Sequence, residues 1–287
     1  MTTKPPRAQG LMGGLTNYGD AGFAAYLRRS FARSMGYSAQ MLAKPVVGIT
    51  ATASDFNNCH RGVPELIEAV KRGVLAAGGL PLEFPTISLG ETFLNPTSMM
   101  FRNLMAMDVE EMIRAQPMDA VVLVGGCDKT VPALLMGAAS AGKPAILLVT
   151  GPMMTSRYRG ERLGACTDCR RFWGQYRAGK VSDEGIQRVE QSLATTAGTC
   201  AVMGTASTMA LIAEAMGVTL PGTAAIPAVH ADRFICAISV APMICRVSGM
   251  NGTWTESTSE RDRSSSNGTK AAPMLRSVSA LAGITSW

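Results

Sequence analysis

Short apolar runs alternate with amphipathic stretches from about Lys44 to Val149, and this alternation constrains the fold more than any other feature. The apolar runs predict four strands, at Pro45–Ala51, Leu80–Ser88, Asp119–Val124 and Pro144–Val149. Helical spacing between them predicts helices over Val63–Ala77, Ser98–Ala115 and Pro132–Ala141. Strands that alternate with helices are typical of a parallel sheet covered by helices. We therefore expect an α/β fold with a ligand site at the carboxyl ends of the strands.

The rest of the chain has a less regular pattern. Gly151–Lys180 is rich in Arg and Gly and predicts an irregular segment, whereas Ser182–Leu193 and Thr199–Met216 have helical spacing. Beyond Arg233 serines are frequent and the apolar periodicity ends. We expect an N-terminal domain over residues 1–233 and an irregular tail, aberrant or disordered, over residues 234–287.

Composition excludes several classes of protein. Hydrophobic residues make up 47% of the chain and charged residues 17%, which is typical of a globular protein with a sizeable core. The net charge of +6 comes from scattered basic residues without zinc-finger spacing or an RNA-binding aromatic signature, so a small anionic partner is expected rather than a nucleic acid. Neither a signal-peptide stretch nor a run of about 18 apolar residues is present, so we expect a cytoplasmic protein that does not enter membranes and keeps its cysteines reduced.

Three of the cysteines lie where this fold would place a site. Cys59 follows the first predicted strand in the sequence DFNNCH, and Cys127 follows the third in GGCDK. Cys200 opens the predicted helix 199–216, where the helix dipole would favour a thiolate. The spacing leaves three interpretations open: ordinary buried cysteines, ligands of a metal cluster, or three quarters of a zinc site.

Carboxylates and a lysine accompany these cysteines. Asp128 and Lys129 follow the second cysteine directly, and Glu91 lies near the end of a predicted strand. Oxygen ligands of this kind suit Mg²⁺, and the alternative is a solvated salt bridge. Cys166 and Cys169 form a C-x-x-C motif, which indicates either a metal or redox site or a plain pair of thiols on an arginine-rich loop.

Several longer motifs decide between these interpretations, because together they resemble one enzyme family. From about Gly19 to Arg233 the chain resembles the dihydroxy-acid and sugar-acid dehydratases, a family that also includes 6-phosphogluconate dehydratase. The matching motifs are Asn58-Cys59, GGCDK around Cys127, GTCAVMGTAST around Cys200, SMMFRNLMAMDVEEMIR from Ser98 and SRYRGERLG from Ser156.

The resemblance implies a hydro-lyase that converts a 2,3-dihydroxy carboxylic acid into a 2-keto-3-deoxy acid. It implies a [2Fe–2S] cluster held by Cys59, Cys127 and Cys200, with one iron left open as a Lewis acid. It also implies Mg²⁺ near three further residues, of which the lysine is carbamylated: Glu91, Asp128 and Lys129. The family forms homodimers or homotetramers.

The substrate class follows from the same resemblance. AGTCAVMGTAST, together with the RYRGERLG loop, looks like the sugar-acid branch, whose substrates are pentonates or similar acids. The alternative is a branched-chain dihydroxy acid.

The chain departs from the family in its length. Family members are much longer, and the part beyond this chain carries a second domain with further Mg²⁺ ligation and the serine base at C2. Nothing in Phe234–Trp287 resembles that domain. We therefore expect a truncated member with an aberrant or out-of-frame tail, which retains the cluster ligands, lacks the base and has little activity. A non-catalytic fragment that binds a cluster is the alternative.

Overall fold

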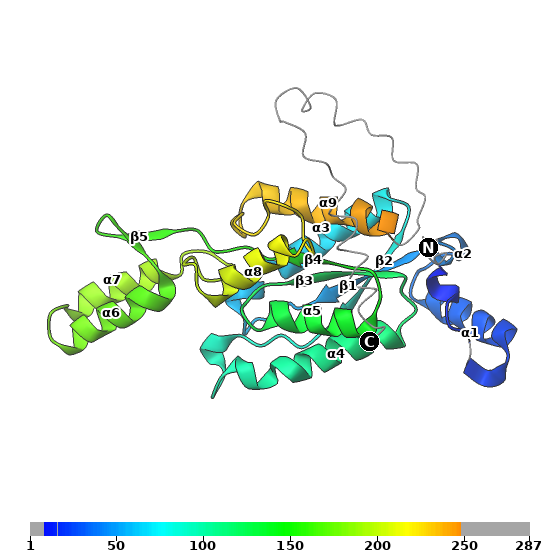
Figure 1. The fold of residues 1–287 in the computed structure, drawn as a ribbon, viewed down its shortest axis with the longest axis horizontal. Helices are drawn as coiled ribbons and strands as arrows, with labels where there is room; N and C mark the ends of the chain where they lie inside the picture. Colours follow the sequence, from blue (N-terminus) through cyan, green and yellow to red (C-terminus); the bar gives the residue numbers. More distant parts are fainter. Residues whose placement is uncertain (1–8, 16, 248–287) are drawn as a thin grey trace, which may run out of the picture.

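The computed structural model describes residues 9–15 and 17–247. Its centre is a four-stranded parallel sheet in the order β2-β1-β3-β4, which confirms the predicted α/β fold (Figure 1). The strands are β1 (Val46–Ala51), β2 (Leu80–Pro85), β3 (Ala120–Gly125) and β4 (Ala145–Val149). Every residue of β3 and β4 is buried, as expected for strands with helices on both faces.

The strand order creates a point where the chain changes direction across the sheet. From β1 the chain moves outward to β2, then returns to place β3 on the other side of β1 and continues to β4. The carboxyl ends of β1 and β3 therefore lie side by side, but the connections that follow them lead in opposite directions across the sheet. In open α/β sheets such a point is the usual place for a ligand.

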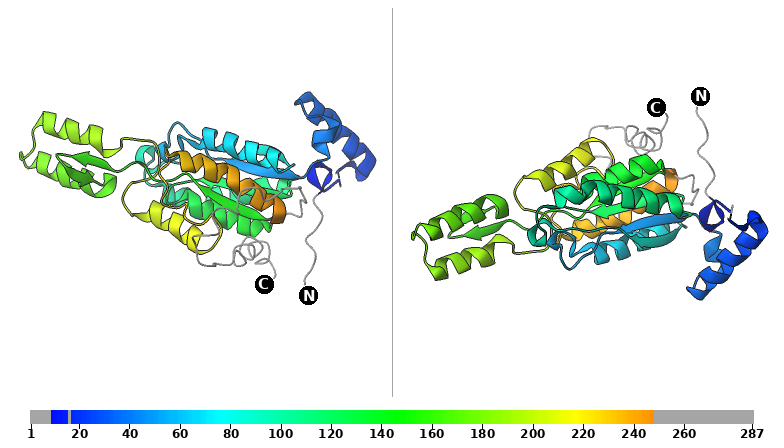
Figure 2. Two further views of the ribbon diagram at one scale, coloured as in Figure 1. Left: turned by 90° about the horizontal axis from the view of Figure 1, so that it is seen from above. Right: turned by 90° about the horizontal axis from the view of Figure 1, so that it is seen from below.

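Helices cover both faces of the sheet. α3 (Val63–Ala76) and α9 (Ala231–Val247) pack on one face, and α4 (Arg102–Ala115) and α5 (Thr130–Ala141) lie on the other, joined there by α8 (Thr205–Ala215) (Figures 1 and 2). The two faces carry separate apolar clusters, one around Val47, Ile49 and Val122 and the other around Val121, Leu123 and Leu147. Among the described residues, no helix is long and apolar enough to cross a membrane.

α9 extends the ordered structure beyond the expected boundary at Arg233. Its inward face is buried against α3 and the sheet through Ala237, Val240, Ala241 and Ile244. The expected irregular tail therefore does not begin at Phe234, because a buried apolar face at helical spacing continues to Cys245. Residues 248–287, to which the prediction of an aberrant tail also applied, lie outside the described residues.

The segment 151–180, which we expected to be irregular, contains regular structure. An antiparallel pair, β5 (Ser156–Tyr158) and β6 (Glu161–Leu163), leads into α6 (Ala165–Arg177). α6 packs against α7 (Asp183–Leu193), and the two helices extend away from the sheet as an arm (Figures 1 and 2). The core of this arm is small: among its described residues, the buried apolar cluster consists of Leu163, Phe172 and Val189.

The N-terminal region lies at the opposite end of the molecule from the arm (Figure 2). It contains α1 (Ala21–Ser34), whose first turn is capped by Asp20, and the short α2 (Ala39–Leu42). Five 3-10 helices complete the elements of the described residues: η1 (Gly10–Met12), η2 (Asn17–Gly19), η3 (Asn58–His60), η4 (Glu91–Phe93) and η5 (Ser98–Phe101).

Candidate active site

The three cysteines singled out in the sequence lie at the carboxyl edge of the sheet, around the change of direction between β1 and β3. Cys59 lies in η3 after β1, and Cys127 follows β3 directly. The segment that carries Cys200 is held at the end of β4 by a parallel bridge between Pro152 and Thr199. Cys127 is buried, while Cys59 and Cys200 are half-buried.

The thiols of Cys59 and Cys127 interact with each other. Hydrogen bonding with the Cys59 thiol lowers the pKa of Cys127. The same bond raises the pKa of Cys59, and burial and neighbouring negative charge raise it further. The pair thus loses a first proton more readily than an isolated thiol and a second proton less readily.

Cys200 lies near the other two cysteines, but it does not lie at the start of a helix as predicted. α8 begins at Thr205, so Cys200 precedes the helix and does not lie in its first turn. The prediction of a thiolate at a helix N-terminus is therefore wrong. The backbone before Cys200 is fixed instead by hydrogen bonds from Gly198 N to Asn58 O (3.2 Å) and from Thr199 N to Gly151 O (3.0 Å). The charge of Cys200 is close enough to raise the pKa of Cys59.

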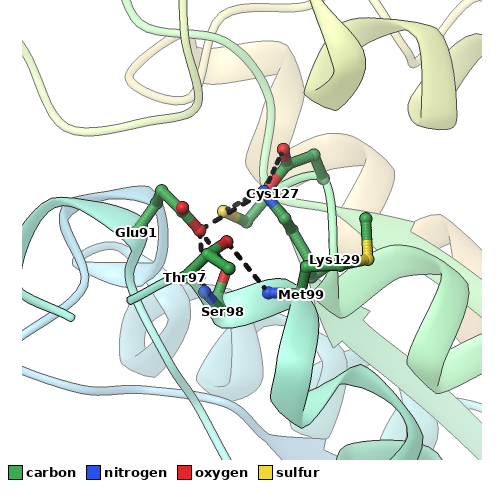
Figure 3. Close-up of polar contacts among 7 residues, drawn as sticks. Glu91, Thr97, Ser98, Met99, Cys127 and Lys129 are labelled. Carbon is green, nitrogen blue, oxygen red and sulfur yellow. Dashed lines mark hydrogen bonds and ion pairs between the residues drawn. The ribbon is translucent and has the colours of Figure 1, made fainter. Parts of the chain in front are cut away.

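Glu91, Asp128 and Lys129 also come together, beside Cys127 (Figure 3). The Lys129 ammonium lies 2.7 Å from Asp128 Oδ2 and 3.3 Å from Glu91 Oε2. Burial by itself would lower the pKa of Lys129, but the bonds to these two carboxylates outweigh it and raise the pKa. Lys129 therefore makes ion pairs with both carboxylates, and its side chain is largely buried.

Glu91 is held by the start of η5 as well as by the lysine. Both the backbone N–H (3.0 Å) and the hydroxyl of Ser98 donate to Glu91 Oε2 (Figure 3). Hydrogen bonds from Ser98 and Thr97 lower the pKa of Glu91 to about 2, with Lys129 contributing less. The carboxylate is therefore ionised at every pH at which the protein would be studied.

Sequence reasoning missed the residues that hold the cysteine segments together. His60 is fully buried, and its ring contacts Asn57, Ser88 and the backbone of Gly126. Burial lowers the pKa of His60 below its usual value, so the ring is neutral at neutral pH. Its position directly after Cys59, in a chain with two histidines, is the signal that could have indicated its role.

The donor set fits the groups that the resemblance implies. Thiolates are the ligands of iron–sulfur clusters, and three thiols here come from three separate segments at one edge of the sheet. Gly126 has no room for a side chain, because a Cβ would collide with the Thr150 hydroxyl and with Thr199, so the backbone before Cys127 is closely packed. In the described part of the chain no three Cys, His, Asp or Glu side chains already surround a single point as metal ligands do.

Comparisons with known proteins show the family to which the chain belongs. A family model described as "Dihydroxy-acid/6-phosphogluconate dehydratase N-terminal" matches residues 44–268, so the similarity continues past Arg233, where we expected the resemblance to end. L-arabinonate dehydratase of Rhizobium leguminosarum bv. trifolii is 46% identical over 77% of this chain and 38% of its own length.

Two further relatives differ in the substrate that their names give. A 6-deoxy-6-sulfo-D-gluconate dehydratase of Pseudomonas putida is 46% identical over 66% of this chain and 33% of its own length. A dihydroxy-acid dehydratase of Clostridium novyi is 38% identical over 74% of this chain and 39% of its own length. The chain thus spans less than two fifths of each of these relatives.

Proposed function

Because the chain belongs to the dihydroxy-acid and 6-phosphogluconate dehydratase family, whose members are hydro-lyases, we propose that its site binds a [2Fe–2S] cluster through Cys59, Cys127 and Cys200. The observation that carries the proposal is the convergence of the three thiols at the change of direction between β1 and β3. Three separate segments meet there, and each contributes one cysteine.

We propose that the neighbouring carboxylates bind Mg²⁺ together with a carbamylated lysine. Glu91 and Asp128 both approach the amine of Lys129, so a modification of that amine would face both carboxylates. Loss of one proton from the ammonium, addition of CO₂ to the resulting amine and loss of a second proton would replace the cation by a carbamate, which is an oxygen donor. The three side chains would then all be oxygen ligands of the kind that Mg²⁺ prefers.

The reaction proposed for this site is the removal of water from a 2,3-dihydroxy acid. Cys59, Cys127 and Cys200 would hold the cluster, which would supply a Lewis acid for the departing hydroxyl, and Glu91, Asp128 and Lys129 would hold Mg²⁺, which would supply positive charge for the acid. The protein contributes the fixed positions of its ligands: Gly126 and Thr199 hold the cysteine segments, and Ser98 holds Glu91 in its ionised form. Loss of the C2 proton and the C3 hydroxyl gives an enol, which becomes the 2-keto acid.

We propose a sugar acid as the substrate class. The relatives named for sugar acids reach 46% identity, whereas the dihydroxy-acid dehydratase of Clostridium novyi reaches 38%. The net charge of +6 suits an anionic substrate of either class. A branched-chain dihydroxy acid is the second candidate, and a panel of both acid types distinguishes the two.

Anaerobic reconstitution of the chain with iron and sulfide tests the cluster. We expect a brown protein with visible absorbance, and we expect Cys59→Ser, Cys127→Ser and Cys200→Ser each to remove most of that absorbance. Cys169→Ser is the matched control, since it lies on the arm, and it should keep the absorbance. Zinc without iron in the purified protein, or equal loss in the control variant, would reject the proposal.

Turnover is a separate measurement. We expect little formation of 2-keto acid by this chain alone from pentonates, because the chain spans only 38% of the L-arabinonate dehydratase that it matches. Cluster uptake without turnover fits a fragment that binds a cluster without catalysis. Turnover at the rate of a complete dehydratase would show that this chain suffices.

A further inference from the structure

The imidazole of His60 connects three segments of the site through hydrogen bonds. Its Nε2 lies 2.9 Å from the N–H and 3.1 Å from the carbonyl oxygen of Gly126, the residue before Cys127. Its Nδ1 lies 2.8 Å from Ser88 Oγ and 3.1 Å from Asn57 Nδ2. Either neutral tautomer satisfies both ring nitrogens, since each of them faces a donor and an acceptor.

Asn57 extends this connection to Cys59. The Asn57 side-chain carbonyl accepts a hydrogen bond from the Cys59 backbone N–H (3.1 Å), while its amide faces the His60 ring. A continuous path of hydrogen bonds therefore runs from the backbone of Cys59, through Asn57 and His60, to the peptide that precedes Cys127. Asn57 is 1% exposed and His60 is 0% exposed, so water does not compete for these bonds.

The third segment leads to Glu91. Ser88 and Gly90 lie in the connection between β2 and η4, which begins at Glu91. Ser88 bonds to the His60 ring, and Gly90 packs so closely on Asn57 that an added Cβ would lie 3.0 Å from the Asn57 Cα. The same histidine thus contacts the segments of Cys59, Cys127 and Glu91.

We propose that His60 is a positioning residue that sets the separation of Cys59 and Cys127 through its bond to Gly126. The proposal rests on the proposed function in one respect, namely that these two cysteines act together as ligands. A histidine that merely filled the core would pack among apolar side chains. His60 instead forms hydrogen bonds with a backbone peptide and two polar side chains that come from three segments of the site.

Two conservative variants separate the contacts of the ring. A glutamine amide reaches the position of Nε2 and can keep the bond to Gly126, whereas an asparagine amide reaches only that of Nδ1 and can keep the bond to Ser88. We expect the rate of cross-linking between Cys59 and Cys127 in His60→Gln to match that of the wild type within about twofold. In His60→Asn and His60→Ala we expect this rate to fall about tenfold, as for the loss of one buried hydrogen bond. His230→Gln is the control, because the His230 side chain is 53% exposed.

The first readout requires no cluster. The reduced 287-residue chain is treated with a short bis-alkylating thiol reagent, and the Cys59–Cys127 cross-link is quantified by mass spectrometry of the peptides. The expected result is a cross-linking rate about tenfold lower in His60→Asn and His60→Ala, and unchanged in His230→Gln. The second readout is the visible circular dichroism of the reconstituted cluster, which reports the geometry of the cluster. We expect the spectra of His60→Asn and His60→Ala to differ from that of the wild type, and the spectra of His60→Gln and His230→Gln to match it.

The two readouts keep this proposal distinct from the proposed function. If the wild type takes up no iron, the proposed function fails while cross-linking still tests His60. If His60→Ala does not fold by far-ultraviolet circular dichroism, the glutamine and asparagine variants decide. Equal cross-linking in these two variants, or wild-type cross-linking in a folded His60→Ala, overturns the positioning role.

Discussion

Cys127 carries the most unusual backbone among the proposed ligands. Its φ is 69°, in the left-handed region that residues with a Cβ rarely occupy. The conformation is fixed on both sides, by Gly126 and its bond to His60 before it and by Lys129 and α5 after it. Strain of this kind gathers at functional sites, where the surrounding structure holds it in place.

This strain predicts an unusual order of stability among Cys127 variants. Cys127→Gly should be more stable than Cys127→Ala by about 1 kcal/mol, because glycine adopts a positive φ without a steric penalty. Both variants lack the thiol, so their difference isolates the backbone. Urea unfolding of the two cluster-free proteins at pH 7 measures it, and an alanine variant as stable as the glycine variant would contradict the strain.

The sequence and the family resemblance singled out the proposed ligand residues but not the conformations that align them. The glycines beside Cys127 indicated a close approach of the backbone, and Gly126 does make one. The left-handed Cys127, the Ser98 contact to Glu91 and the role of His60 depend on atoms that are distant in the sequence. Patterns of local spacing carry no information about such contacts.

Among the elements, α9 makes the contact that most clearly extends the domain beyond Arg233. Gly73 of α3 faces Ile238 and Ala241 of α9, and a Cβ on Gly73 would collide with the Ile238 carbonyl oxygen and lie 2.9 Å from the Ala241 Cβ. Glycine allows the two helix backbones to come together at this point.

Gly73→Ala should therefore destabilise the fold by about 1–3 kcal/mol, since it overpacks the contact between the helices. Gly174→Ala in α6 is the control: no atom lies within 4 Å of its added Cβ, so it should be neutral or stabilising by up to about 1 kcal/mol. Thermal unfolding of both variants provides the test. A harmless Gly73→Ala would show that α9 does not pack on α3.

The arm offers a prediction that depends on pH. Asp168 accepts a hydrogen bond from Gly164 N (2.7 Å) and forms an ion pair with Arg171 (2.8 Å). These contacts lower the pKa of Asp168 below the ordinary value of 3.8. Because the folded pKa is lowered, the contribution to stability is complete well above pH 3.8 and is lost as the pH falls through the folded value.

Asp168→Asn should thus destabilise the arm by about 0.5–1.5 kcal/mol at pH 7, and the difference from wild type should shrink as the pH falls below 4. Hydrogen exchange of α6 amides at pH 7, together with urea unfolding from pH 7 to 3.5, measures both parts. A difference that stays constant across this range would exclude ionised Asp168 as its cause.

The predictability of an element followed the strength of its local pattern. β1, β3 and β4 are runs of apolar residues buried on both faces, and the sequence alone indicates them. α6 contains cysteines, arginines and few apolar residues that face a core, so its arginine-rich composition suggested a loop. α9 was not predicted, because serine-rich sequence follows it. Its own residues nevertheless form an apolar face that includes Ala237, Val240, Ala241 and Ile244.

For the whole molecule, the organising feature is that the strands of separate βα units all end at one edge of the sheet. The alternating pattern of the sequence predicts this edge, because all strands of a parallel sheet end on the same side. It does not predict the strand order, which decides that Cys59 and Cys127 follow neighbouring strands. The resemblance named the three cysteines as one set, and the arrangement of the strands gives a physical reason for it.

A comparison of two shortened chains tests how far the folded unit extends. A chain that ends at Arg233 would lose the buried face of α9 and expose the apolar surface of α3 and the sheet beneath it. Val240 and Ile244 are fully buried, and each such side chain contributes about 1.5–3 kcal/mol, against a total stability of about 5–15 kcal/mol. A chain that ends at Val247 keeps every contact described here.

We therefore expect the chain 1–247 to be soluble, with a cooperative thermal transition, and the chain 1–233 to aggregate or to bind a hydrophobic dye strongly without such a transition. The soluble fraction after expression, dye fluorescence and calorimetry measure the difference. A cooperative transition in the chain 1–233 would place the end of the folded unit at Arg233, before α9 is complete. Its absence would make α9 an integral part of the domain, because the face of the sheet that carries Val47, Ile49 and Val122 cannot be covered by α3 alone.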